Sequence, residues 1–428
     1  MKQYNNPIRS DWKKLTARAS ATYASLEPLA KEVFENVRLN GDASLSAYTL
    51  KFDGVNLDSF QVSPNETAAA ESRVPQSLKN AIEIARNNIL TFHKAQKTTT
   101  VKVETQAGVY CWQKKTPIEK VGLYIPGGSA PLFSTVLMLA IPANIAGCEE
   151  IVLCSPPDKN GNLPDVILYT AKRCGVTKIF KVGGIQAIAA MTFGTTTIPQ
   201  VDKIFGPGNQ YVTVAKQLAT QYHVAIDMPA GPSELMVVAD ETADPSFIAS
   251  DLLSQAEHGP DSQVLLITTS KAIAEETQKA VLLQLKNIER KDIAQKALDN
   301  SKIIVFNDNQ TALDFANQYG AEHLIVCVKE EEEFIEGIKS AGSVFIGNYT
   351  PESAGDYASG TNHTLPTNGY VRQYSGVNLD SFLKAITYQK ITKEGLMNLG
   401  PAIEEMAAAE GLQAHKNAVT LRLKSLKK

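Results

Sequence analysis

Short runs of apolar and β-branched residues alternate with helix-length segments through the middle of the chain. One series of such runs covers residues 121–125, 151–154, 178–182 and 203–205. A second series covers residues 234–238, 263–268, 303–306, 324–328 and 343–346. Strands separated by segments of helix length are typical of βαβ units and parallel sheets. The pattern predicts two doubly wound sheets, because a single sheet that held every strand would be unusually large.

The two ends of the chain show helical periodicity instead. Between residues 16 and 93, the clearest apolar stripe consists of Leu78, Ala81, Ile82, Ala85, Ile89 and Phe92. After residue 378, a similar stripe consists of Leu379, Phe382, Leu383 and Ile386. We therefore expect an α/β fold with two Rossmann-like doubly wound domains, and small helical segments at the N- and C-terminal ends.

Composition and charge narrow the classes of function. The chain has 428 residues, of which 43% are hydrophobic and 20% are charged, as expected of a globular protein with more than one domain. Its 42 basic and 45 acidic residues nearly balance, which argues against nucleic acid or an anionic membrane as the main partner. Residues 1–15 are polar and basic, unlike a secretory signal or an anchor, so we expect a cytoplasmic protein.

Three glycine-containing loops follow predicted strands of the first series, at residues 124–131, 182–186 and 205–209. The carboxyl ends of parallel strands share one edge of a sheet, and ligands of doubly wound proteins bind there. Tyr124, Gln186 and Asn209 add side chains that can hydrogen-bond a nucleotide. No G-x-G-x-x-G fingerprint is present, since residues 206–211 lack the third glycine. Nucleotide binding and ordinary turn geometry both remain open from these loops.

Four of the six histidines are near an acid or an amide in the sequence. The pairs are Gln255 with His258, Glu322 with His323, Asp356 with His363, and Glu410 with His415. Each pair alone is better explained as a surface ion pair or an ordinary hydrogen bond. Together, imidazoles, carboxylates and an amide oxygen suit Zn²⁺ or a similar divalent cation, although none of the spacings is a contiguous zinc motif.

The same segments resemble stretches of the histidinol dehydrogenase family, in the same order along the chain. The matching stretches are residues 121–135, 204–209, 225–234, 251–263, 322–324, 352–360 and 415–422. The resemblance implies an enzyme that oxidises L-histidinol to L-histidine through L-histidinaldehyde, the final steps of histidine biosynthesis. It further implies two successive NAD-dependent hydride transfers, one Zn²⁺ per subunit, and a homodimer with shared active sites.

The resemblance also implies roles for individual residues. The catalytic acid and base would be Glu322 and His323. The zinc ligands would be Gln255, His258, Asp356 and His415, the last supplied across the dimer. The substrate contacts would be Ser233, Gln255, His258, His323, Asp356, His363, Glu410 and His415. The NAD contacts would be Tyr124, Gln186 and Asn209.

The expected domains follow from the same resemblance. Residues 1–20 would form an N-terminal helical extension, and residues 21–123 with 233–377 a larger α/β domain that holds most metal and catalytic residues. Residues 124–232 would form an inserted α/β domain that binds NAD. Residues 378–428 would form a C-terminal helical segment that contributes to the partner's active site.

The implied mechanism has zinc hold the substrate while His323 removes the alcohol proton and Glu322 activates water for the second oxidation. One alternative is a zinc-dependent hydrolase on the same scaffold, which needs a metal and a carboxylate base but no dinucleotide. Tyr124, Gln186 and Asn209 would then have no role. Another alternative is a binding protein that has lost its chemistry, against which the intact Glu322 and His323 argue.

Overall fold

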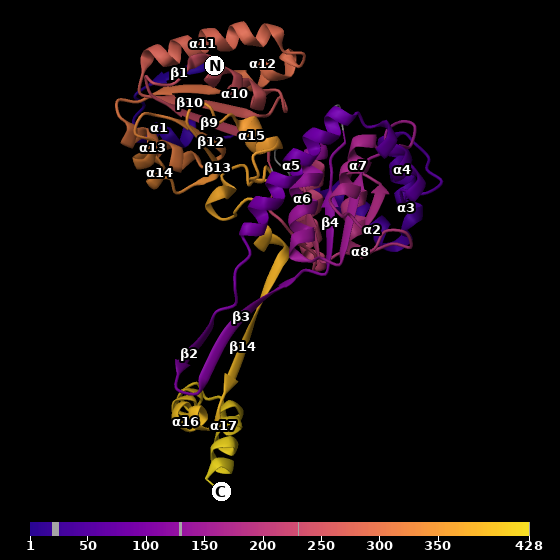
Figure 1. Ribbon diagram of the computed structural model, residues 1–428, viewed down its shortest axis with the longest axis vertical. Helices are drawn as coiled ribbons and strands as arrows, with labels where there is room; N and C mark the ends of the chain where they lie inside the picture. The colour runs from indigo at the N-terminus through magenta and orange to yellow at the C-terminus, as the bar shows by residue number, and fades with distance from the viewer. Residues whose placement is uncertain (19–24, 128–130, 230, 428) are drawn as a thin grey trace. The chain divides into compact units, whose positions relative to one another are not determined.

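Two parallel sheets and one small antiparallel sheet organise the chain (Figure 1). The computed structural model describes residues 1–18, 25–127, 131–229 and 231–427. The described chain divides into two units, one formed by Met1–Gln96 and Ile118–Phe382, the other by Lys97–Pro117 and Leu383–Lys428. The first unit holds the two parallel sheets, and the second holds the antiparallel sheet.

The larger parallel sheet has six strands, and all of its neighbouring strands pair in parallel. Their order is β1 (Lys2–Asn5), β11 (Lys302–Val305), β10 (Gln263–Thr268), β9 (Glu234–Ala239), β12 (Ala321–Cys327) and β13 (Ala341–Ile346). Every residue of the central strands β10, β9 and β12 is buried. Continuous burial is expected where helices cover both faces of a parallel sheet.

Successive residues of β9 face opposite sides of this sheet. Leu235, Val237 and Ala239 belong to one apolar core, whereas Met236 and Val238 belong to the other. The first core is completed by α10 (Pro245–Ala256), α11 (Lys271–Gln284) and α12 (Lys291–Asp299), and the second by α1 (Arg9–Leu15), α13 (Asn309–Tyr319) and α14 (Glu331–Glu336) (Figure 1). The sheet is therefore the middle layer of three.

The five-stranded sheet is built in the same way. Its order is β6 (Lys178–Lys181), β5 (Glu150–Ser155), β4 (Lys120–Tyr124), β7 (Lys203–Phe205) and β8 (Ala225–Ile226), all parallel. One core is shared by α2 (Glu27–Asn40), α3 (Asp42–Asp53), α8 (Gly184–Phe193) and α9 (Gln210–Ala219). The remaining helices are α4 (Pro64–Arg73), α5 (Gln76–Ala95), α6 (Phe133–Ala146) and α7 (Asp165–Arg173), with α6 packed against α5 and α7.

The second unit contains three antiparallel strands and two helices. The strands are β14 (Leu383–Ile391), β3 (Val109–Pro117) and β2 (Lys102–Gln106), in that order. The helices are α16 (Lys393–Ala409) and α17 (Gln413–Leu426). Gly400 lets these two helices approach closely, because a Cβ there would lie 2.9 Å from the Leu423 side chain. Within the described ranges, none of the helices combines the length and apolar character that a bilayer crossing requires.

The predicted α/β fold is confirmed. Strands form in every segment of the two predicted series, and they lie in two separate parallel sheets flanked by helices. The helix predicted from the stripe that begins at Leu78 also forms, as α5. The division of the chain into an NAD-binding domain and a larger domain stays a prediction.

Two expectations about local structure are wrong. Residues 2–5 of the expected helical extension form β1, which pairs with β11. Residues 383–391 form β14 rather than part of a helical stripe, because they pair along their whole length with β3. In each case the deciding partner is distant in sequence, so the local pattern does not reveal it.

The N-terminal segment should depend on Trp12 for its attachment to the six-stranded sheet. Trp12 is 1% exposed, its ring centroid lies 5.2 Å from that of Phe315, and its indole N–H donates to the Pro7 carbonyl. We expect Trp12→Ala to cost about 3–5 kcal/mol of stability and to lower the thermal unfolding midpoint. Ile8→Ala is the matched control, because Ile8 is 67% exposed in the same segment. Equal midpoints for the two variants would contradict this account.

Candidate active site

A cavity of about 640 Å³ is lined by residues at the carboxyl end of the five-stranded sheet and at the amino end of the six-stranded sheet. Gly206 and Asn209, which line it, follow the carboxyl end of β7. Ser233 and Ser262 line it from just before β9 and β10, and Glu322 from the start of β12. The rule that ligands bind beyond the carboxyl ends of strands therefore holds here for the five-stranded sheet only. The six-stranded sheet contributes its amino ends.

Glu322 and His323 are buried at the start of β12 and are held by the neighbouring strand β9. The Glu322 carboxylate accepts a hydrogen bond of 2.8 Å from the backbone N–H of Glu234. His323 Nδ1 lies 3.3 Å from the Glu234 carbonyl oxygen and 3.7 Å from Glu322 Oε2. Because a carbonyl oxygen only accepts, this contact places a hydrogen on Nδ1. The other ring nitrogen, Nε2, is buried and forms no hydrogen bond among the described residues.

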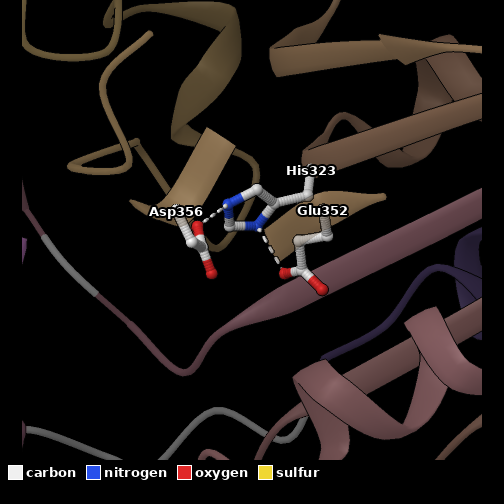
Figure 2. A group of neighbouring side chains, drawn as sticks. All are labelled: His323, Glu352 and Asp356. Atoms are coloured by element: carbon white, nitrogen blue, oxygen red, sulfur yellow. Dashed lines mark ion pairs between the residues drawn. The ribbon is translucent and has the colours of Figure 1, made fainter. Parts of the chain in front are cut away.

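Figure 2 shows the imidazole of His323 between two further carboxylates. Glu352 Oε1 lies 3.4 Å from Nδ1, and Asp356 Oδ1 lies 3.4 Å from Nε2. Both acids belong to the short helix α15 (Glu352–Tyr357), where their i, i+4 spacing puts them on one face. Sequence reasoning gave Glu352 no role. The signal that could have found it is this helical spacing to Asp356.

Burial and mutual charge shift the pKa values of this cluster strongly. Burial raises the pKa of Glu322 to about 8, and burial likewise raises the pKa of Glu352 to about 8. Burial alone would lower the pKa of His323, but Glu322, Glu352 and Asp356 outweigh that effect and raise it to about 10. Glu322, Glu352 and His323 therefore hold protons tightly.

Three further predicted site residues line the same cavity. Gln255 and His258 lie at the end of α10, and His363 lies in the loop after α15. The amide nitrogen and oxygen of Gln255 and the Nε2 atom of His363 are buried. None of these three atoms has a hydrogen-bond partner among the described residues. Burial lowers the pKa of both His258 and His363, which keeps their imidazoles neutral. Buried polar atoms in this state are suited to bind a ligand.

These residues fit a divalent cation by their chemistry. Gln255 offers an amide oxygen, His258 a neutral imidazole and Asp356 a carboxylate, which are ligand types that Zn²⁺ accepts. The ligand atoms of His323, Glu352 and Asp356 also lie within 4.8 Å of one another. The end of α10 adds the partial negative charge of a helix C-terminus, which favours a cation.

The predicted NAD contacts gather around a second cavity, of about 870 Å³, at the carboxyl end of the five-stranded sheet. The Tyr124 hydroxyl accepts a hydrogen bond of 3.1 Å from the backbone N–H of Gly184. Gln186 is 1% exposed, and its Oε1 has no hydrogen-bond partner among the described residues. Asn209 caps α9 by accepting from two backbone N–H groups. Pro126 and Asn209 line both cavities, so the two are adjacent.

A buried ion pair that sequence reasoning missed fixes the loop that holds Asn209. The Lys216 ammonium contacts the Asp227 carboxylate and donates to the Gly206 carbonyl oxygen at 2.8 Å. Asp227 in turn accepts from the Gly206 N–H at 2.8 Å. Gly206 has φ +126°, and a Cβ there would lie 2.1 Å from the Tyr124 carbonyl oxygen. The loop is thus pressed onto the end of β4, and only glycine fits.

Glu410 and His415 lie in the second unit. Glu410 is at the end of α16 and His415 is in the first turn of α17, and both are exposed. The structure thus brings Ser233, Gln255, His258, Glu322, His323, Asp356 and His363 to one cavity, with Asn209 at its edge. The joining of Glu410 and His415 to this group stays a prediction.

Comparison with known proteins agrees with this arrangement over the whole chain. The family model for histidinol dehydrogenase matches residues 16–423. A histidinol dehydrogenase of Bacteroides thetaiotaomicron is 56% identical over 427 residues, covering 100% of each chain. One of Escherichia coli O6:H1 is 52% identical, covering 97% of this chain and 98% of its own.

A solved structure gives the same result. The crystal structure of histidinol dehydrogenase from Elizabethkingia anophelis matches with a TM-score of 0.99 at 55% identity, covering 100% of this chain and 99% of that one. The chain therefore belongs to the histidinol dehydrogenase family and is an oxidoreductase of histidine biosynthesis.

Proposed function

We propose that this enzyme oxidises L-histidinol to L-histidine through L-histidinaldehyde in two successive NAD-dependent hydride transfers, with Zn²⁺ beside the substrate. The observation that supports this most is the adjacency of two cavities. One holds the buried Glu322–His323 pair among cation-binding side chains, and the other holds Tyr124 and Gln186. Asn209 lines both, which suits a reaction between a bound substrate and a bound dinucleotide.

The residues that would hold zinc are Gln255, His258 and Asp356, with His415 from the partner copy completing the set. When bound, Zn²⁺ is a Lewis acid that orients nitrogen and oxygen groups of the substrate. We keep His323 outside the ligand set, because its proton transfer requires a free ring nitrogen. Ser233, His363 and Glu410 would contact the substrate, the first two from the wall of the cavity.

His323 would accept the alcohol proton in the first oxidation. Its Nδ1 is committed to the Glu234 carbonyl oxygen, so Nε2 is the atom that exchanges a proton with the substrate. The carboxylates around the ring raise the pKa of His323, and a cation bound by Asp356 would lower it again and leave the imidazole able to accept a proton. NAD⁺, when bound, accepts the hydride that leaves the carbinol carbon.

Glu322 would act in the second oxidation by removing a proton from the water that hydrates the aldehyde. Burial raises its pKa to about 8, close to the pH at which a general base exchanges protons most effectively. The Glu234 N–H binds Glu322 Oε2, so Oε1 is the oxygen that would accept this proton. His323, which lines the same cavity as Glu322, would then assist in deprotonating the hydrate.

We further propose a cytoplasmic homodimer in which each active site receives residues from both subunits. His415 and Glu410 are exposed on the second unit, so another copy can reach them. The hydrolase alternative loses support, because it leaves the second cavity and its buried Gln186 without a role. The alternative of an inactive binding protein conflicts with the intact Glu322–His323 pair.

The first test is the stoichiometry of the reaction. The zinc-loaded enzyme, given L-histidinol and excess NAD⁺, should release two NADH for each histidine formed, because the overall oxidation removes four electrons. NADH is followed by absorbance and histidine by chromatography of the same samples. A chelator should abolish both products, and added zinc should restore them. Folded, zinc-loaded enzyme that releases no NADH would overturn the proposed function.

Glu322→Gln should separate the two oxidations. The variant keeps the shape of the side chain but cannot accept a proton, so oxidation of histidinaldehyde should slow by about 10²–10⁴-fold. Oxidation of histidinol, measured by the first NADH in a single turnover, should slow by less than about tenfold. Equal losses in the two steps would remove the role assigned to Glu322.

The shared metal site predicts complementation between two inactive variants. His258→Ala and His415→Ala should each lose bound zinc, whereas His323→Gln, the control, should keep it. After mixing and subunit exchange, a dimer with one copy of each variant contains one intact site, so roughly a quarter of wild-type activity should return. Full zinc content in His415→Ala, or no recovery on mixing despite exchange, would contradict the shared site.

A further inference from the structure

We propose that Arg18 and Glu234 form a positioning pair that sets the geometry of both Glu322 and His323. The inference deepens the proposed function and rests on it. Neither residue touches the substrate in this proposal. They act through the backbone N–H and C=O of one residue of β9, Glu234, and through the carbonyl groups that lead into β12.

The Glu234 carboxylate is held from three directions. Arg18 Nε donates to Glu234 Oε1 at 2.5 Å, and Arg18 Nη2 donates to Oε2 at 2.9 Å. The backbone N–H of Asn368 also donates to Oε1, at 2.8 Å. The exposed fractions of the Arg18 and Glu234 side chains are 14% and 3%. A two-pronged, water-excluded pair of this kind fixes orientation as well as distance.

Arg18 also binds the segment that enters β12. Its Nη2 donates to the carbonyl oxygens of Tyr319 and Gly320 at 2.9 and 3.1 Å. Its guanidinium lies over the Tyr319 ring, 4.0 Å from the centroid. The Tyr319 hydroxyl donates to Gln263 at the start of β10. One guanidinium therefore joins the start of β9 to the residues directly before Glu322.

The backbone of Glu234 is what reaches the catalytic pair. Its N–H donates to Glu322 Oε2 at 2.8 Å, and its carbonyl oxygen faces His323 Nδ1 at 3.3 Å. The same residue thus orients the carboxylate and fixes which ring nitrogen faces the substrate. Ser233, immediately before it, lines the cavity. A small displacement of this residue would change both catalytic groups together.

The pair is better explained by positioning than by stability. A buried ion pair is often no more stabilising than apolar residues of the same volume, because both charges must lose their water. In this protein the Arg18 guanidinium also donates to the carbonyl groups of Tyr319 and Gly320, which an apolar side chain could not do. Displacements of about 1 Å in a reacting group can reduce rates by about a hundredfold.

The experiment uses two variants and one control in the full-length, zinc-loaded enzyme. Arg18→Lys keeps the charge but loses the two-pronged geometry. The double variant Arg18→Met with Glu234→Gln removes both charges, so no lone charge is buried, and Gln keeps an acceptor for Asn368. Ile303→Val is the control, because it changes a buried residue in β11 of the same sheet, away from the site.

We expect kcat for both oxidations to fall by about ten- to a hundredfold in Arg18→Lys and in the double variant. KM for NAD⁺ should change by less than about twofold, because the cofactor contacts lie on the other sheet. A second readout does not depend on turnover: in NMR spectra of ¹⁵N-histidine-labelled enzyme, the Nδ1–H of His323 should exchange slowly in wild type and quickly in both variants. His323→Gln identifies that signal.

The outcomes are distinguishable. Rates and His323 exchange that match the Ile303→Val control would overturn the positioning role while leaving the proposed function intact. Wild-type enzyme that fails to oxidise histidinol would overturn the proposed function, and the Nδ1–H exchange would still decide whether Arg18 and Glu234 orient His323. If the double variant does not fold, Arg18→Lys decides alone.

Discussion

The register between β9 and β12 is the constraint on which the site depends. His323 pairs with Leu235 across these two central strands, which brings the Glu234 backbone within reach of both Glu322 and His323. On the other side of β12, a Cβ at Gly342 would lie 2.5 Å from the Glu322 carbonyl oxygen, so β13 packs closely there. A slip of one residue would therefore take the Glu234 N–H and carbonyl oxygen out of reach of Glu322 and His323.

This fixed register lets the protein bury three carboxyl groups around one imidazole. Glu322, Glu352 and Asp356 surround one imidazole, and burying carboxylates is costly unless donors are provided. The Glu234 N–H donates a hydrogen bond to Glu322, and the Ser254 hydroxyl donates one to Glu352. Ser254 binds only one oxygen of Glu352, and the other, Oε1, lies 3.4 Å from His323 Nδ1.

The sequence predicts what is encoded locally. The buried run of β9 and the glycine loop at Gly206 are visible in short windows, and the family resemblance adds roles for the residues around them. Pairings between distant residues are not visible. Arg18 and Glu234 are separated by 216 positions, and β14 forms only because residues 109–117 lie beside it. The role of Glu352 could not be predicted, because acids are common in helices and its contact with His323 exists only in the folded chain.

The opposite strand ends at the cavity also explain how one site would serve the proposed anionic cofactor and the proposed cation. On the five-stranded sheet, α8 and α9 begin beside the second cavity, and helix N-termini favour phosphate groups. On the six-stranded sheet, α10 ends beside Gln255 and His258, and a helix C-terminus favours positive charge. Had both sheets presented carboxyl ends, helix N-termini would surround the cation ligands and weaken its binding. The reversed sheet therefore gives each half of the site the field that its proposed ligand requires.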